Sequence, residues 1–254
     1  MKLNNDLLLL NLTADFGSGP SLLHPVLILD DEAGHTLVDA GVPGMEDAIN
    51  AELATLGLSL KDIKQVIVTH HDLDHIGSLP AIITASGAQV WALEREIPLI
   101  EGDEWPQKRP KPEQVEQMMA DPTVPQPRKE MIRRMSALPP VQVKVNRSLR
   151  DGEMLPLAGG VRVVATPGHT FGHASLYLER SKTLITGDAL VSEQGQLGAP
   201  RAQVTPDMTA ASESVSKMAA LDVNTIVTYH GGVVSEGANG QLRRVADEMA
   251  GTDG

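Results

Sequence analysis

The sequence of 254 residues predicts an α+β protein, in which short buried strands alternate with helices. Three observations support this fold class. Runs of β-branched residues such as 66–68 recur along the chain, and such runs are typical of strands buried on both faces. Segments with helical spacing, such as 206–221, lie between these runs. Candidate metal ligands are spread from residue 70 to residue 230 and must converge, which favours a single domain over residues 1–254.

The first part of the chain combines strand patterns with two helical segments. A turn at 31–34 separates two of the strands, and Gly57 is placed to end the first helix. Residues 59–62 have the form of a capping box that begins one short turn. The predicted strands are residues 7–12, 25–30, 35–39, 66–68 and 88–93, and the predicted helices are 43–56 and 79–85.

Residues 94–140 differ in character, because prolines separate charged pieces that contain methionine. Residues 113–120 and 128–138 are predicted helices, and Met131, Met135 and Leu138 share one helical face. These side chains either pack the insert onto the domain, line a substrate pocket, or form the face of a dimer. We expect a helical insert at about 94–140 and regard a homodimer through it as one of these alternatives.

The last part of the chain repeats patterns of the first part. Residues 225–230 resemble 66–71, and 183–188 resemble 36–41, which suggests two related half-domains with functional groups at equivalent strand ends. The predicted strands are residues 141–145, 161–165, 174–178, 183–186 and 225–229, with a turn at 149–153 and helices at 206–221 and 239–249.

Composition limits the partners. The chain has 33 acidic against 21 basic side chains, a formal charge of −12, so a nucleic acid would be repelled. It has no cysteine and therefore no disulfide or thiolate ligand, which is compatible with a reducing compartment. The apolar run 7–10 is too short for a signal peptide or a membrane span. We expect a cytoplasmic protein that acts on a small molecule and binds neither nucleic acid nor membrane.

Four side chains that can bind metal follow the predicted strand at 66–68, namely His70, Asp72, Asp74 and His75. At this spacing, a loop that leaves a strand can turn two of them toward one ion and two toward a second ion. Imidazole suits zinc, iron and nickel, whereas carboxylates favour iron and manganese, so the set indicates a transition metal. A polar loop without a metal is the alternative. It is disfavoured because six of the eight histidines fall in three strand-end motifs, at 70, 71, 75, 169, 173 and 230.

Residues 70–75 resemble the His-x-His-x-Asp-His signature of the metallo-β-lactamase superfamily, with Asp72 where the second histidine is expected. Residues 166–173, Thr-Pro-Gly-His-Thr-Phe-Gly-His, resemble a second signature, in the form seen in hydroxyacylglutathione hydrolases. Four motifs match in order along nearly the whole chain. The resemblance implies a four-layer αβ/βα sandwich, the metallo-β-lactamase fold, with two metals at one edge between two sheets.

The resemblance also implies a ligand set. The first metal is assigned to His70, Asp72 and His169, the second to Asp74, His75 and His230, with Asp188 bridging both. Asp74 is the candidate catalytic residue, because it would also orient the attacking hydroxide. Asp39 either hydrogen-bonds the metal loop, as an acidic residue does in the family, or only closes a turn. His71 is expected to point away from the metals, with contact to the substrate as the alternative. His173 is expected to support a ligand or to have a structural role rather than to bind metal.

Two divalent metals about 3.5 to 4 Å apart can share a hydroxide at neutral pH and polarise the oxygen of the bond under attack. We therefore predict a hydrolase of an ester, thioester or lactone. Zinc is the first candidate metal, and Asp72 keeps iron and manganese open. With Asp72, three carboxylates and a hydroxide cancel the charge of the two ions, which weakens the site as a Lewis acid. Lactonases of the superfamily carry a tyrosine where this chain has Val191, so their usual helper is missing.

The alternative is an iron-dependent oxidoreductase that resembles persulfide dioxygenases or flavodiiron proteins. Flavodiiron proteins place a glutamate at the position of Asp72. No flavin-binding segment is visible in the sequence, which counts against this alternative. A binding module without catalysis would need lost ligands, and every ligand position is filled by a residue that can bind metal.

Overall fold

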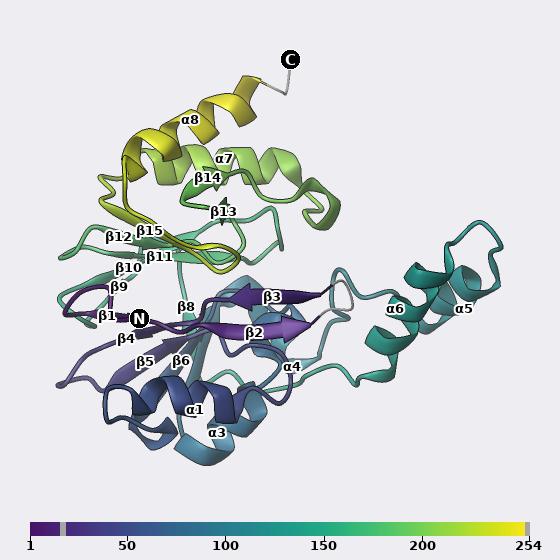
Figure 1. Cartoon of the computed structure of the whole chain (residues 1–254), viewed down its shortest axis with the longest axis horizontal. Helices are drawn as coiled ribbons and strands as arrows, with labels where there is room; N and C mark the ends of the chain where they lie inside the picture. Colours follow the sequence, from purple (N-terminus) through teal and green to yellow (C-terminus); the bar gives the residue numbers. More distant parts are fainter. Residues whose placement is uncertain (16–18, 252–254) are drawn as a thin grey trace.

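Two six-stranded sheets face each other in the computed structural model of the chain, which describes residues 1–15 and 19–251 (Figure 1). The first sheet has the order β1-β4-β5-β6-β7-β8 and the second the order β16-β15-β12-β11-β10-β9. The strands of the first sheet are β1 (Leu7–Leu9), β4 (Val26–Ile28), β5 (His35–Val38), β6 (Ile63–Val68), β7 (Gln89–Leu93) and β8 (Arg147–Leu149). Those of the second are β9 (Met154–Leu155), β10 (Val161–Ala165), β11 (Ala174–Leu178), β12 (Thr183–Ile185), β15 (Thr225–Thr228) and β16 (Gly232–Val234).

Helices cover the outer face of each sheet. In Figure 1, α1 (Glu46–Ala54) and α3 (Leu79–Ser86) lie below the first sheet, and α7 (Met208–Ala219) and α8 (Ala238–Gly251) lie above the second. The remaining helical segments are α2 (Leu73–Ile76), α4 (Ile97–Glu101), α5 (Pro112–Ala120), α6 (Gln126–Ala137) and the short 3₁₀ turns η1 (Leu60–Asp62), η2 (Glu94–Glu96) and η3 (Ala202–Val204). None of the helices in the described ranges is long and apolar enough to cross a membrane.

Three apolar cores lie between these four layers. Because side chains alternate along a strand, Leu7 and Leu9 face the second sheet whereas Leu8 faces the helices of its own half. Ile67 likewise joins the core between the sheets, while Val66 and Val68 join the core under α1 and α3. This two-sided burial explains why the strands are apolar throughout rather than alternating. The fold is the predicted four-layer αβ/βα sandwich.

The two halves have the same local topology. β4 pairs antiparallel with β5, which pairs parallel with β6, and β11 pairs antiparallel with β12, which pairs parallel with β15. The segments 36–41 and 66–71 contain the ends of β5 and β6 and the residues after them, and their echoes 183–188 and 225–230 stand in the same relation to β12 and β15. The repetition predicted from sequence is therefore confirmed, and it places the candidate ligands after equivalent parallel strands.

Several strand predictions need correction. The run 7–12 divides into β1 and β2 (Leu12–Asp15), because β1 pairs with β4 whereas β2 pairs with β3 (Pro20–Leu23) in a separate hairpin. Residues 141–145 are not a strand; the Val143 N–H donates to Ile100 O, and no ladder forms there. The hairpin of β13 (Val191–Glu193) and β14 (Gln196–Gly198) was not predicted.

The insert forms an arm that projects from the sandwich, with α5 and α6 at its end (Figure 1). These helices match the predicted segments 113–120 and 128–138 to within two residues at each boundary. Met131, expected either to pack the insert onto the domain or to line a pocket or dimer face, is 50% exposed. Its exposure does not support packing against the sandwich.

Candidate metal centre

The loop after β6 divides its four candidate ligands into two pairs. His70 and Asp72 lie in extended chain before α2, whereas Asp74 and His75 lie on the single turn of α2. That turn begins at Asp72, whose carbonyl accepts from the backbone N–H groups of His75 (2.9 Å) and Ile76 (3.0 Å). The change from extended to helical backbone makes the two pairs diverge, as the spacing predicted.

The first group comprises His70, Asp72 and His169, whose ligand atoms lie within 4.8 Å of one another. Asp72 Oδ2 is 3.3 Å from His70 Nε2 and 3.2 Å from His169 Nε2. His169 comes from the loop between β10 and β11 in the other half of the molecule. The structure thus brings together the three residues assigned to the first metal.

The second group comprises Asp74, His75 and His230, again within 4.8 Å. Asp74 Oδ2 is 3.3 Å from His230 Nε2 and 3.9 Å from His75 Nε2. His230 follows β15, so this group also joins the two halves of the molecule.

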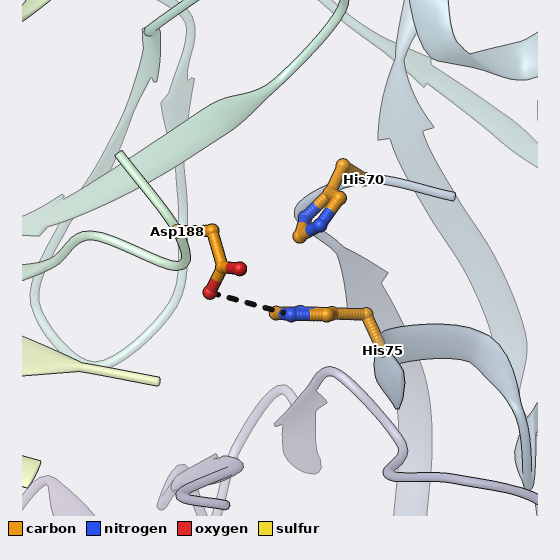
Figure 2. A group of neighbouring side chains, drawn as sticks. All are labelled: His70, His75 and Asp188. Atoms are coloured by element: carbon orange, nitrogen blue, oxygen red, sulfur yellow. Dashed lines mark ion pairs between the residues drawn. The ribbon is translucent and has the colours of Figure 1, made fainter. Parts of the chain in front are cut away.

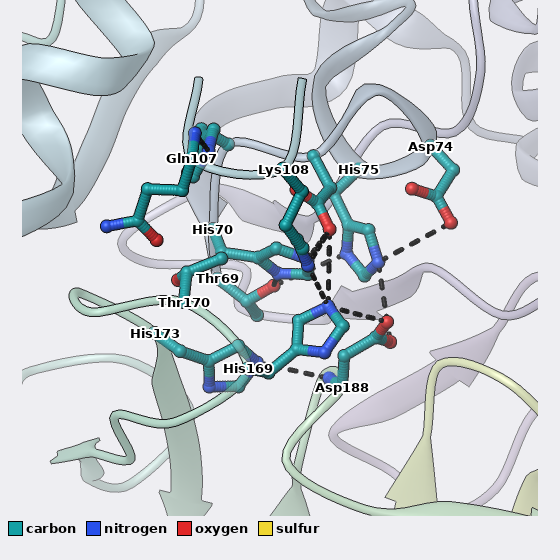
Figure 3. Close-up of polar contacts among 12 residues, drawn as sticks. Thr69, His70, Asp74, His75, Gln107, Lys108, His169, Thr170, His173 and Asp188 are labelled. Atoms are coloured by element: carbon teal, nitrogen blue, oxygen red, sulfur yellow. Dashed lines mark hydrogen bonds and ion pairs between the residues drawn. The ribbon is translucent and has the colours of Figure 1, made fainter. Parts of the chain in front are cut away.

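Asp188 lies between the two groups. Its carboxylate oxygens are 3.2 Å from His169 Nε2 and 3.4 Å from His75 Nε2 (Figures 2 and 3). They are also 3.5 Å from His230 Nε2. It therefore reaches candidate ligands of both groups, which is the position that a bridging carboxylate requires.

The donor set fits metal ions. Ligand atoms around a tetrahedral ion with bonds of about 2.1 Å are separated by about 3.4 Å, close to the distances above. Three buried atoms that face this space, His70 Nε2, His75 Nε2 and Asp188 Oδ1, have no hydrogen-bond partner among the described residues. Burial, followed by the nearby His75, lowers the pKa of His70 well below its ordinary value. A neutral imidazole with a free Nε2 is the form that binds metal.

The pKa shifts of the other charged groups favour ion pairs among them. Burial alone would raise the pKa of Asp188, but His75 and His230 hold it well below its ordinary value. Burial would lower the pKa of His230, yet Asp188 and Asp74 raise it to about 9. For Asp72, desolvation is outweighed by His70 and His169, which keep its pKa well below the usual range. These pairs offset the repulsion among the neighbouring carboxylates.

Asp39 and Thr69 orient two of the histidines. The Asp39 carboxylate accepts from His75 Nδ1 (2.9 Å), from Thr69 N–H (2.9 Å) and from the Thr69 hydroxyl (2.8 Å). The Thr69 hydroxyl also lies 3.0 Å from His70 Nδ1 and can accept from it. With both Nδ1 atoms engaged, His70 and His75 present Nε2 to the metal space. Of the two interpretations of Asp39, the contact with the metal loop is the one that the structure shows.

His173 holds the backbone at Asp188. Its Nε2 accepts from the Asp188 N–H (3.1 Å), and its Nδ1 lies 2.8 Å from Thr166 Oγ1. A Cβ at Gly187 would come within 2.7 Å of His173 Nε2, so the approach requires a glycine, which also has φ +51°. His173 thus has the structural role that was expected of it.

Glu96, which sequence reasoning missed, connects the two metal loops. It is fully buried, accepts from His71 N–H (2.9 Å) and contacts His71 Nδ1, while its other oxygen accepts from the Thr170 hydroxyl (3.2 Å). His71 therefore points away from the metals, as predicted. Glu96 follows β7, the parallel neighbour of β6, and this position at a strand end was the signal that could have found it.

Lys108, from the insert, was also missed. Its ammonium contacts Asp72 Oδ2 and lies 2.6 Å from His169 Nε2 (Figure 3). No local pattern in the proline-rich insert marks this lysine. Tyr229 packs against His75 with ring centroids 3.8 Å apart, and its hydroxyl donates to Asp74 O (2.5 Å).

Comparison with known proteins identifies relatives of the chain. The family model described as the metallo-beta-lactamase superfamily matches residues 22–230. The probable metallo-hydrolase YflN of Bacillus subtilis is 30% identical over 207 residues, which cover 77% of this chain and 74% of that protein. A hydroxyacylglutathione hydrolase of Fuscovulum blasticum is 29% identical over 206 residues, which cover 79% of this chain and 59% of that protein.

Solved structures share the fold. A metallo-beta-lactamase family protein of Thermus thermophilus superposes with a TM-score of 0.74 at 26% identity, over 99% of this chain and 80% of that one. The similarity extends over both sheets and their helices, and it agrees with the four-layer architecture described above.

Proposed function

The chain belongs to the metallo-β-lactamase superfamily, and from that premise we propose that it is a hydrolase that uses two divalent ions to cleave an ester, thioester or lactone of a small molecule. Members of this superfamily are mostly metal-binding hydrolases, and relatives of the chain carry the name metallo-hydrolase. The observation that carries the proposal is the convergence of seven candidate ligands, from residues 70 to 230, on one buried space bridged by Asp188.

Divalent ions held in these two groups would lower the pKa of a coordinated water and polarise the carbonyl oxygen of the substrate. The side chains of the protein would hold the ions in place and accept the proton of the attacking water. Asp74 is assigned as the catalytic residue: its side chain is 21% exposed, so it can contact an ion and accept a proton from the attacking water. The buried Asp39 carboxylate pairs with His75 and so keeps the His75 imidazole, next to Asp74, in one orientation.

The names of two relatives indicate which class of substrate to test first. Two relatives are named hydroxyacylglutathione hydrolase, at 29% identity each, which supports testing a thioester first. Zinc is the proposed ion. Iron and manganese are the alternatives, because a carboxylate ligand such as Asp72 favours these metals.

The test begins with protein purified without added metal. Its metal content is measured by elemental analysis, and hydrolysis is assayed on a panel of thioesters, lactones and phosphodiesters. We expect hydrolysis that a chelator abolishes and zinc restores. Asp188→Ala should lose both metal and activity, whereas Asp222→Ala, an exposed aspartate that pairs with Lys182, should keep both. Hydrolysis that survives both the chelator and Asp188→Ala would overturn the proposal, and iron with dioxygen uptake would establish the oxidoreductase alternative.

A further inference from the structure

An ammonium group from the insert occupies one edge of the first ligand group. Lys108 Nζ contacts Asp72 Oδ2 and lies 2.6 Å from His169 Nε2, and these two ligand atoms are themselves 3.2 Å apart (Figure 3). The Lys108 side chain is 19% exposed, so it is largely buried in the centre. Two of the three ligand atoms assigned to the first metal are therefore engaged by a cation that the chain supplies.

These contacts exclude a metal ion on His169. A neutral imidazole has one nitrogen lone pair in its ring plane for a metal, so His169 Nε2 either accepts from the ammonium or binds the ion. The ammonium would also repel a divalent ion held by Asp72. Lys108 must therefore withdraw before the first group can close around an ion.

Within the described ranges, no lysine or arginine competes in this way at the second group. The ion pairs of the Asp74 carboxylate and His230 Nε2 at this site are with each other, His75 and Asp188, and none of the described lysines or arginines forms an ion pair with them. The two groups thus share Asp188, and among the described residues a lysine pairs only with the first group.

The backbone on either side of Lys108 is fixed to both metal loops. Gln107 N–H donates to His71 Nε2 (3.1 Å), between the ligands His70 and Asp72 in sequence. Phe171 N–H, two residues after His169, donates to the Gln107 side-chain oxygen (3.1 Å). Because one residue binds both loops, the insert delivers its lysine to a defined point.

We propose that Lys108 is a built-in competitor for the first metal ion, so that this ion binds more weakly than the second. The carboxylate at Asp72 is part of the same device, because a neutral histidine there would offer the ammonium no counter-charge. The inference rests on the metal-dependent function proposed above. It predicts a protein that retains the second ion through purification and exchanges the first one readily.

The test is a titration of metal-free protein with zinc against a chromophoric chelator. The wild type should bind one ion tightly and a second at least about tenfold more weakly. Lys108→Met, which keeps the length and removes the charge, should tighten the weaker step by about tenfold or more and leave the tighter step unchanged. Lys108→Arg, which keeps the charge, should retain the weak step. Lys111→Met, an exposed lysine of the same insert, is the matched control and should behave as wild type.

The outcomes separate the two proposals. The role of Lys108 would be overturned if the wild type bound both zinc ions with equal affinity. It would also be overturned if Lys108→Met left the affinity of the weaker binding step unchanged or lowered it. Either result would leave the metal-dependent function intact. If neither the wild type nor any variant bound zinc, the proposed function itself would fall. Circular dichroism of each variant checks folding, and the tight step serves as an internal measure of an intact site.

Discussion

Asp39 offers a sharp test of how the metal loop is oriented. Its carboxylate is 1% exposed and accepts three hydrogen bonds, two from Thr69 and one from His75 Nδ1. The residue has φ +62°, a conformation that asparagine tolerates far better than alanine. Asp39→Asn therefore keeps the shape and the backbone and removes only the charge and one acceptor.

The size of the effect follows from these contacts. An asparagine oxygen can keep the bond from Thr69 N–H, but its amide nitrogen then faces two donors, the Thr69 hydroxyl and His75 Nδ1. Each lost hydrogen bond to a buried charge costs about 1.5–3 kcal/mol, so the variant should lose about 2–4 kcal/mol after partial relaxation. His75 would also be free to place its proton on Nε2, the metal-facing atom, and outer partners of metal ligands are typically worth about 10–100-fold in affinity.

Urea unfolding and zinc affinity by chelator competition measure the two effects separately. The matched control is Asp62→Asn, since Asp62 accepts from Ser59 N–H (2.8 Å) and the Ser59 hydroxyl (2.9 Å) in a capping box outside the metal centre. The control should lower stability and leave zinc affinity unchanged. If Asp39→Asn bound zinc as tightly as wild type, or if both variants lost zinc equally, the argument for orientation by Asp39 would be wrong.

Three further predictions concern the ligands themselves. Asp188 and Asp74 raise the pKa of His230 to about 9 in spite of burial, so zinc must displace a proton from His230 at about neutral pH. The apparent affinity for zinc should therefore rise about tenfold per pH unit up to about pH 9. Calorimetry in two buffers measures the protons released on binding, and no release would contradict this prediction. Asp72→His should change the ratio of zinc to iron taken up from a mixture, and an unaltered ratio would show that Asp72 is not a ligand. His173→Ala removes the acceptor of the Asp188 N–H, so it should cost about 1–3 kcal/mol in unfolding free energy and reduce metal content; a variant with full metal content would argue against this role.

Much of the fold could be predicted because its signals are local. The runs 66–68 and 226–227 are apolar on both faces, and they form β6 and β15, which are covered by a sheet on one side and helices on the other. The echoes between residues 36–41 and 183–188 follow from equivalent places in two similar halves. The seven candidate ligands could be named for the same reason, since each stands in a motif at the end of a strand or in a tight turn.

The residues that sequence reasoning missed depend on contacts between distant segments. Lys108 reaches the first ligand group from a segment whose Gln107 binds both the loop after β6 and the loop after β10. The error at 141–145 has a related cause: the segment has the alternation of a strand, but Val143 N–H donates to Ile100 O, which belongs to helix α4 and not to a strand. Periodicity is a property of one segment, whereas a β-ladder or an ion pair also depends on a second segment that is distant in the sequence.

The central claim is that these seven side chains hold two metal ions, and anomalous X-ray scattering from crystals grown with zinc tests it most directly. Two peaks are expected, one among His70, Asp72 and His169 and the other among Asp74, His75 and His230, each within about 2.0–2.3 Å of its ligand atoms and of Asp188. Absence of both peaks, or strong peaks elsewhere with these side chains bound to no ion, would contradict the account.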